Sequence, residues 1–264
     1  MAPDLVNSII VIIFGLCAGS FASVLTHRIP ENKSIVKPPS MCDYCASPLA
    51  PRDLIPVFSF IFSKGMSRCC SKKISVQYPL IELATALLFL LSYLSTGFSL
   101  KFASLVVLST LSAPLTLIDL RIKRLPNVLT LFGFLGGIAL SIISAVLEKS
   151  PTVLYHCLLI ILISTLVFFL IHQISKGGMG MGDVKLAAML AALTCIFGWR
   201  VMFVGMFFAF LIGAVVGILM LVTKKATRKS AIPFAPFMIF GIWTALITGP
   251  ETLNTVTKLW ALNN

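Results

Sequence analysis

The stretch KGGMGMGDVKL, residues 176–186, separates two apolar runs with four glycines and one aspartate. These runs, 151–173 and 183–197, are typical of membrane helices and set the class of fold. Glycine lets two backbones approach closely and adopt unusual dihedral angles. An ionisable side chain at the edge of a bilayer span indicates function, because its charge is costly there without a partner. Asp183 is therefore expected to have a polar partner at the same depth.

The composition predicts an all-α polytopic membrane protein. Of the 264 residues, 58% are hydrophobic and 11% are charged, and the mean hydropathy is +1.01. A soluble domain keeps about a quarter of its residues charged, and a helix needs about 20 apolar residues to cross the hydrocarbon core. We expect about eight transmembrane helices, at 5–25, 78–97, 102–118, 127–147, 151–173, 183–197, 201–222 and 232–249.

Lysine and arginine are distributed unevenly between the loops. Of 21 such residues, 17 lie in one alternating set of loops, which includes the long loop 26–77, and 4 lie in the other set. Because basic loops stay in the cytoplasm, we expect loop 26–77 inside and both termini outside. Topology and contact with anionic membrane lipids account for the net charge of +12, so nucleic acid is not required as a partner.

Three acidic residues, Glu82, Asp119 and Asp183, lie at or just inside the cytoplasmic ends of expected spans. Two neighbouring aspartates cannot both ionise easily, so one keeps a proton while the other acts as a base. Such a pair can direct water onto a peptide carbonyl without a metal or a covalent intermediate. One alternative is a transporter that uses the two aspartates for ions or protons. Another is that each aspartate caps a helix or pairs with Arg121, Lys123, Arg124 or Lys185.

Several motifs, in order along the chain, resemble those of type IV prepilin peptidases. IDLRIKRLPNVLT (118–130) is similar to their first aspartate motif, and GMGMGDVKLAAML (178–190) is similar to the second, which contains the G-x-G-D pattern of intramembrane aspartyl proteases. GLCAGSFASVLTHRIP (15–30) and ISVQYPLIELATALLF (74–89) resemble their first two spans. CDYC (42–45) and PRDLIPVFSF (51–60) also match the family's order.

The resemblance implies a bifunctional enzyme of the bacterial inner membrane. Such enzymes cleave the leader from type IV prepilins or pseudopilins of pilus and type II secretion systems, at the cytoplasmic face. They then methylate the new N-terminus with S-adenosylmethionine. By motif position, Asp119 and Asp183 are the catalytic residues. A peptidase without methyltransferase activity is the alternative, in which the cysteine-containing loop serves as a docking element.

The loop between the first two spans carries a possible zinc site. Cys42-x-x-Cys45 has the spacing of two ligands of tetrahedral zinc. Many family members have a second such pair, but the resemblance places Ser67 at the third cysteine position. We expect a zinc site formed by Cys42, Cys45, Cys69 and Cys70, or by three cysteines and another ligand, with a reduced metal-free loop as the alternative.

Two further residues are candidates for methyl transfer. Gly65 matches a family glycine associated with methylation, and Glu82 is a candidate ligand for a cationic cofactor or, alternatively, the partner of a basic side chain. The expected division is 1–25 for the first helix, 26–77 for the zinc and methyltransferase region, and 78–264 for the peptidase domain. The apolar surroundings of Cys17, Cys157 and Cys195 predict simple packing.

Overall fold

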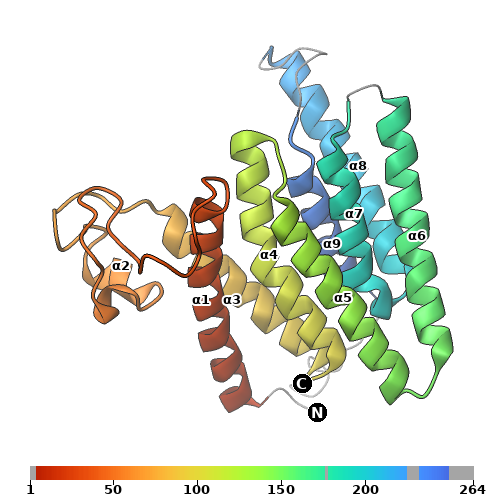
Figure 1. Cartoon of the computed structure of the whole chain (residues 1–264), viewed down its shortest axis with the longest axis horizontal. Coiled ribbons are helices and arrows are strands. Elements are labelled where there is room, and N and C mark those ends of the chain that lie inside the picture. The colour runs from red at the N-terminus through yellow and green to blue at the C-terminus, as the bar shows by residue number, and fades with distance from the viewer. Residues whose placement is uncertain (1–3, 176–177, 225–231, 250–264) are drawn as a thin grey trace, which may run out of the picture. The chain divides into compact units, whose positions relative to one another are not determined.

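A computed structural model describes residues 4–175, 178–224 and 232–249 (Figure 1). Within these ranges the chain is helical, with isolated β-bridges in the loop after the first helix as its only strand-like pairing. Lys176, Gly177, the basic residues at 225–229 and the two chain ends lie outside the described residues. The helices are α1 (Leu5–Arg28), α2 (Phe58–Phe62), α3 (Gln77–Thr96), α4 (Leu100–Ile122), α5 (Asn127–Leu147), α6 (Pro151–Ile174), α7 (Met181–Thr194), α8 (Trp199–Val222) and α9 (Ala235–Thr248), with 3-10 turns η1 (Pro51–Asp53) and η2 (Cys195–Phe197).

The predicted all-α membrane class is confirmed. Each expected apolar segment corresponds to one helix, and six of the described helices are long and apolar enough to cross a membrane: α1, α3, α4, α5, α6 and α8. Helices α7 and α9 have 14 residues each. The third expected segment ends too early, because α4 continues to Ile122 and includes Asp119 in its last turns. Asp183 is the third residue of α7 rather than the first.

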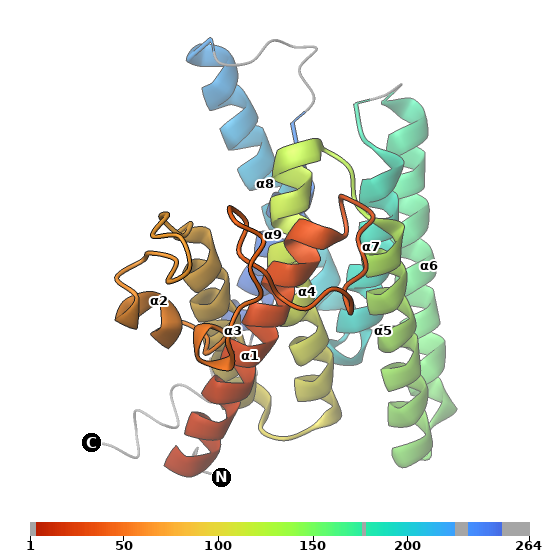
Figure 2. The same ribbon diagram turned by 60° about the vertical axis from the view of Figure 1, so that its left-hand side comes forward.

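The chain divides into two compact units, 1–93 and 94–264. In the first unit, α1 packs on α3 through two glycines spaced as Gly-x-x-x-Gly, and Figure 2 shows the two helices with the irregular loop that joins them. A Cβ atom added to Gly15 would lie 2.6 Å from the Cα atom of Ala86, and one added to Gly19 would lie 2.5 Å from that of Glu82. Small residues at this spacing allow close backbone contact between membrane helices.

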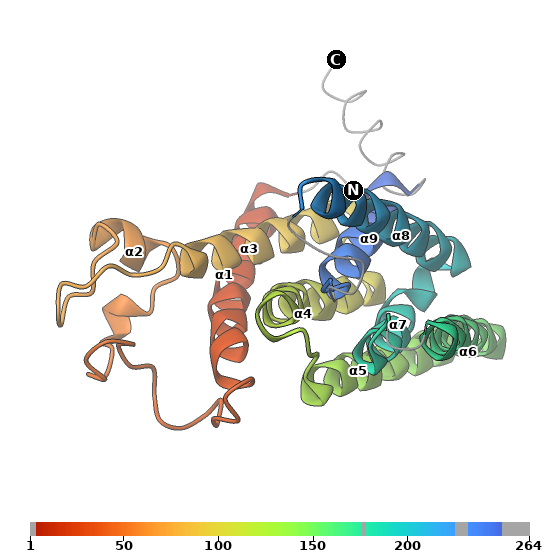
Figure 3. The ribbon, with the colours of Figure 1, turned by 90° about the horizontal axis from the view of Figure 1, so that it is seen from above.

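Helix α7 is the central helix of the second unit. It contacts α4, α5, α6, α8 and α9, and Figure 3 shows it between α5, α6 and α9. Nine of its 14 residues are buried. Gly133 and Gly137 of α5 face it, and a Cβ atom on Gly137 would lie 2.5 Å from the carbonyl carbon of Ala192. Helix α7 is therefore enclosed by neighbouring helices, which hold Asp183 in its first turn in place.

The expectation of simple packing is wrong for two cysteines. Cys157 of α6 and Cys195 of η2 form a disulfide, with Cα atoms 4.9 Å apart. The sequence conceals this pairing because the two residues are 38 positions apart and each lies in an apolar run. Cys17 is a free cysteine with an exposed side chain on α1.

Candidate functional site

Asp119 lies in the last turns of α4 and is 5% exposed. Its Oδ2 atom accepts a hydrogen bond of 3.1 Å from the backbone N–H of Ala235, the first residue of α9. The N-terminal N–H groups of a helix have no partner within the helix. The Asp119 carboxylate, which comes from another helix, is thus a suitable acceptor for the Ala235 N–H group.

Asp183 lies in the first turn of α7, where the helix dipole favours a negative charge. Its Oδ2 atom accepts a hydrogen bond of 3.2 Å from the backbone N–H of Gly180, the N-cap residue. Gly182 lets the turn lie close to the first aspartate motif, since a Cβ atom there would be 3.3 Å from Cβ of Leu125. The glycine-rich turn therefore lies against the first aspartate motif.

The two aspartates belong to one site. Helices α4 and α7 are in contact, and the carboxyl groups of Asp119 and Asp183 are close enough for electrostatic repulsion. The Nζ atom of Lys185, a candidate partner of Asp183, donates instead to Oδ1 of Asn127 at 2.8 Å. This bond is a second link between the two aspartate motifs.

His172 supports the glycine-rich turn from the end of α6. Its Nδ1 atom is 2.7 Å from the carbonyl oxygen of Met179. The imidazole also lies close enough to Asp183 for an electrostatic interaction. Neither this contact nor the Ala235 contact of Asp119 could be found in the sequence, because each joins segments whose relative positions depend on tertiary packing.

The cysteine loop, residues 29–76, contains two turns of the same shape, 42–47 and 67–72. In each, the N–H of the first residue donates to the carbonyl oxygen five positions later, at 2.9 Å in the first turn and 2.8 Å in the second. The fifth residue of each turn has a positive φ, 54° at Ala46 and 55° at Ser71. Ser67 therefore occupies in the second turn the place that a cysteine occupies in the first.

The four predicted ligands lie together at these turns. The Sγ atoms of Cys42, Cys45, Cys69 and Cys70 are all within 4.8 Å of one another. In a tetrahedral site with Zn–S bonds of about 2.3 Å, the sulfurs are about 3.8 Å apart. The Sγ atoms of Cys42 and Cys70 are 3.7 Å apart, and those of Cys45 and Cys69 are 3.1 Å apart. The four thiols are therefore close enough to act as ligands of one metal ion, with separations on both sides of the tetrahedral value.

Ser67 acts on the thiols from within this cluster. Its Oγ atom is 3.3 Å from Sγ of Cys42 and 3.0 Å from Sγ of Cys69. The Ser67 hydroxyl, followed by the backbone N–H groups of Tyr44 and Cys45, lowers the pKa of Cys42 to about 6. Because the thiolate is the form that binds metal, the turn favours the ligand form of Cys42.

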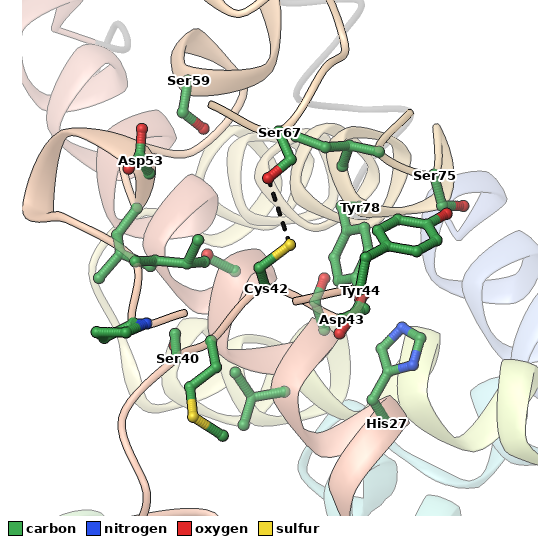
Figure 4. A pocket seen from close by; sticks show the side chains of 18 of the residues that line it. His27, Ser40, Cys42, Asp43, Tyr44, Asp53, Ser59, Ser67, Ser75 and Tyr78 are labelled. Atoms are coloured by element: carbon green, nitrogen blue, oxygen red, sulfur yellow. Dashed lines mark hydrogen bonds between the residues drawn. The ribbon is translucent and has the colours of Figure 1, made fainter. Parts of the chain in front are cut away.

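A cavity of about 890 Å³ lies in the first unit, between α1, the cysteine loop and the start of α3 (Figure 4). Cys42 and Ser67 form one part of its wall. Tyr78 forms another, donates to Oδ2 of Asp43 at 2.8 Å and stacks its ring on that of His27. Sites for small molecules and cofactors have volumes of about 300–1,000 Å³. The cavity is therefore large enough for a cofactor.

Glu82 also lines this cavity and is buried. Its Oε2 atom accepts a hydrogen bond of 2.7 Å from the backbone N–H of Val57, and the Ser20 hydroxyl is a second partner. Val57 has a φ of 62°, which is unusual for a β-branched residue. Neither of these hydrogen-bond partners is a basic residue, which was the expected alternative for Glu82. Glu82 instead holds a strained turn at the cavity wall.

Gly65 lies just before the second turn of the cysteine loop. Its φ is +70°, and a Cβ atom there would be 3.1 Å from the ring of Phe60. Its N–H donates to the carbonyl oxygen of Phe60 at 2.9 Å, and its own carbonyl accepts from Ile74 at 2.8 Å. The backbone conformation thus explains why a glycine stands at position 65, because other residues are strained at such a φ.

Comparison with known proteins identifies the two parts of the chain separately. Residues 13–96 match the Bacterial Peptidase A24 N-terminal domain, and residues 105–218 match the Type IV leader peptidase family. The first match includes α1, the cysteine loop and α3, and the second includes both aspartates. No solved structure matches the chain.

Curated relatives match the chain over nearly its whole length. A protein named prepilin leader peptidase/N-methyltransferase from Bacillus subtilis (strain 168) is 33% identical over 95% of this chain and 98% of its own length. Proteins with the same name are 28% identical in Aeromonas hydrophila, over 97% and 93%, and 30% identical in Pseudomonas aeruginosa, over 92% and 91%. With both aspartate motifs inside the matched region, the chain belongs to the type IV leader (prepilin) peptidase family.

Proposed function

We propose that this chain is a membrane aspartyl peptidase that removes the leader from type IV prepilins or pseudopilins and then methylates the new N-terminus. The observation that carries the peptidase assignment is the pair Asp119 and Asp183, on contacting helices and within each other's electrostatic reach. The family match covers both residues. The names of the relatives supply the substrate class and the second activity.

The pair supports peptide hydrolysis by proton transfer alone. One carboxylate takes a proton from water as the water oxygen bonds to the scissile carbonyl carbon, and the protonated partner gives its proton to the carbonyl oxygen. Collapse of this intermediate breaks the C–N bond: the amine leaves with the proton that the first carboxylate took, and one hydroxyl of the intermediate returns a proton to the partner carboxylate. A prepilin begins with a short leader and continues as an apolar helix, so its scissile bond would lie at the depth of these helix ends.

The active site faces the cytoplasm in this proposal. The uneven distribution of lysine and arginine supports that orientation. The disulfide of Cys157 and Cys195 supports it independently, because disulfides persist in oxidising compartments outside the cytoplasm. Cys157 is near the start of α6, whereas His172, near its end, contacts the turn that carries Asp183. The disulfide and Asp183 thus lie at opposite ends of α6 and α7.

The methyl donor, S-adenosylmethionine, would bind in the cavity beside the cysteine loop. Its sulfonium group is a cation in a positively charged chain, and the buried carboxylate of Glu82 at the cavity wall is a suitable partner. The bound cofactor supplies the methyl group, and the freed amine of the substrate must reach it in its neutral form. Gly65 would contribute by fixing the shape of the adjoining turn.

Glu82 variants separate a charge role from a shape role. Gln keeps an oxygen that can accept from the Val57 N–H but lacks the negative charge, whereas Ala removes both. If Glu82 binds the cofactor cation, Glu82→Gln should raise the KM for S-adenosylmethionine about tenfold or more, as expected for loss of a charge-assisted contact. Normal methylation by Glu82→Gln and reduced methylation by Glu82→Ala would show that Glu82 only holds the turn.

We also propose that zinc stabilises the cysteine loop, with Cys69 replacing the thiol that is missing at position 67. Cys69→Ser should then reduce bound zinc, measured by elemental analysis, and Ser67→Cys should restore it in that variant. The double variant Cys42→Ser with Cys45→Ser should lose zinc and N-methylation but keep leader cleavage. A parent protein without bound metal would refute the zinc site and leave the peptidase assignment intact.

The proposed function is tested by incubating the purified protein with a prepilin in detergent, with and without S-adenosylmethionine. Mass spectrometry should show loss of the leader in both samples and one added methyl group only with the cofactor. Cleavage without methylation would leave a peptidase alone. No cleavage of any type IV prepilin or pseudopilin tested would overturn the assignment.

A further inference from the structure

The start of α9 is joined to the aspartate pair although it lies outside the matched peptidase region, 105–218. The backbone N–H of Ala235 donates to Oδ2 of Asp119 at 3.1 Å, and both residues are buried. The neighbouring amide of Phe234 also interacts with this carboxyl group. The peptidase site therefore includes backbone groups from a helix more than a hundred positions away along the chain.

The reason for this contact lies in the sequence of α9. Phe234 is the N-cap residue and has no side-chain oxygen to accept from the first N–H groups. Pro236, in the first turn, has no N–H. Asp119 of α4 thus supplies the cap that the helix lacks, and the helix in return holds one oxygen of the carboxylate.

A second contact keeps α9 fixed against α4. The Nε1 atom of Trp243 donates to Oγ of Ser112 at 3.0 Å, and both residues are buried. Ser112 and Asp119 are seven residues apart on α4, and Ala235 and Trp243 are eight apart on α9, so each pair lies on one face of its helix. The two bonds therefore join α9 to α4 at points two turns apart, and the Trp243 bond does not touch the carboxylate.

We propose that the first turn of α9 is a positioning element of the peptidase, and that it occupies Oδ2 of Asp119 so that Oδ1 exchanges the proton with water. The inference rests on the proposed function of the aspartate pair. It assigns separate tasks to the two oxygens of Asp119 and makes the Ala235 amide a requirement for fast cleavage. It also makes α9 part of the functional unit, although the matched family region ends within α8.

The first test removes the N–H group of Ala235. Ala235→Pro deletes the donor at the first position of the helix, where proline itself is tolerated, but it also disfavours the αR conformation of Phe234 before it (φ −101°, ψ −22°). Ala235→Gly keeps the donor. A hydrogen bond to a charged group contributes enough free energy to change a rate about 10- to 100-fold when it is lost. We expect Ala235→Pro to lower kcat by that factor, with KM for the prepilin unchanged and the pH–rate profile altered. Ala235→Gly should retain kcat within about threefold.

Trp243→Phe is the structural control, because it removes a different bond between α4 and α9 and leaves the Ala235 amide in place. It should lower the melting temperature in detergent without changing the pH–rate profile. If Ala235→Pro and Ala235→Gly have the same kcat and pH–rate profile while Asp119→Asn is inactive, the positioning role is wrong and the peptidase assignment stands. If the parent protein does not cleave a prepilin, the proposed function itself fails.

Hydrogen–deuterium exchange provides a second measurement that does not depend on the folding of Ala235→Pro. In Asp119→Ala, the peptide that begins at Phe234 should exchange faster than in the parent protein, while peptides around Trp243 stay protected. Equal exchange at the start of α9 in the two proteins would overturn the inference, because it would show that Asp119 does not cap this helix.

Discussion

Replacing Gly137 with alanine should slow leader cleavage about 10- to 100-fold, although this residue is remote from both aspartates in sequence. Gly137 lies on α5 against the backbone of α7, and an added Cβ atom would be 2.5 Å from the carbonyl carbon and 2.7 Å from the carbonyl oxygen of Ala192. These are backbone atoms, so no side-chain rotation can relieve the overlap. Ordinary contact begins at 3.4 Å, so α5 and α7 must separate locally by about 0.9 Å.

This displacement would reach the active site through α7. The helix has 14 residues and carries Asp183 in its first turn, whereas Asp119 lies on α4. A misplacement of about 1 Å in a catalytic group can reduce a rate about 100-fold, and partial repacking accounts for the lower end of the expected range. Overpacking a tight contact also lowers the free energy of unfolding by about 1–3 kcal/mol.

Gly136→Ala is the matched control, because the nearest atom to its added Cβ would be Cγ1 of Val107 at 3.9 Å. Both variants add one methyl group to the same helix. The assay is the steady-state cleavage of a purified prepilin, with thermal unfolding in the same detergent. Gly137→Ala should be slow and less stable, and Gly136→Ala should resemble the parent protein. If the two variants cleave at rates within twofold of each other, close packing of α5 on α7 does not position Asp183.

Two further predictions concern the disulfide and the cysteine loop. Mass spectrometry of protein alkylated without reduction should find Cys157 linked to Cys195, and alkylation of both residues would remove the disulfide's support for the orientation of the active site. Gly65→Ala should reduce N-methylation and preserve cleavage, because alanine is strained at its φ of +70°. Gly97→Ala, at a φ of +60° outside the cysteine loop, controls for general strain, and equal methylation by the two variants would refute a local role.

The sequence predicted the fold class and the approximate positions of the membrane helices, because bilayer thickness imposes length and hydrophobicity on each helix separately. It also predicted that Asp119 and Asp183 meet, since matched depth and a glycine-rich approach are local features. The spacing of Cys42 and Cys45 and the family resemblance around Ser67 predicted the cysteine cluster, although they did not predict that the Ser67 hydroxyl contacts two of the thiols.

The features that the sequence did not predict all depend on tertiary contacts between distant segments. The Ala235 amide carries no side-chain signal, and the position of His172 beside the glycine-rich turn depends on how α6 ends. The pairing of Cys157 with Cys195 requires the packing of α6 against α7. The bond from Glu82 to the backbone of Val57 likewise depends on the path of an irregular loop. Sequence patterns therefore located the chemical groups but not the backbone contacts that orient them.

The most direct test of the aspartate pair is cleavage of a prepilin by purified Asp119→Asn and Asp183→Asn beside the parent protein. Asparagine keeps the shape of the side chain but cannot exchange the proton that hydrolysis requires. The parent protein should remove the leader in the presence of a metal chelator, and each variant should lose at least about 100-fold in rate, the scale of positioned acid–base catalysis, while keeping its detergent-solubilised fold by thermal unfolding. Cleavage at a near-parental rate by either variant would contradict the account.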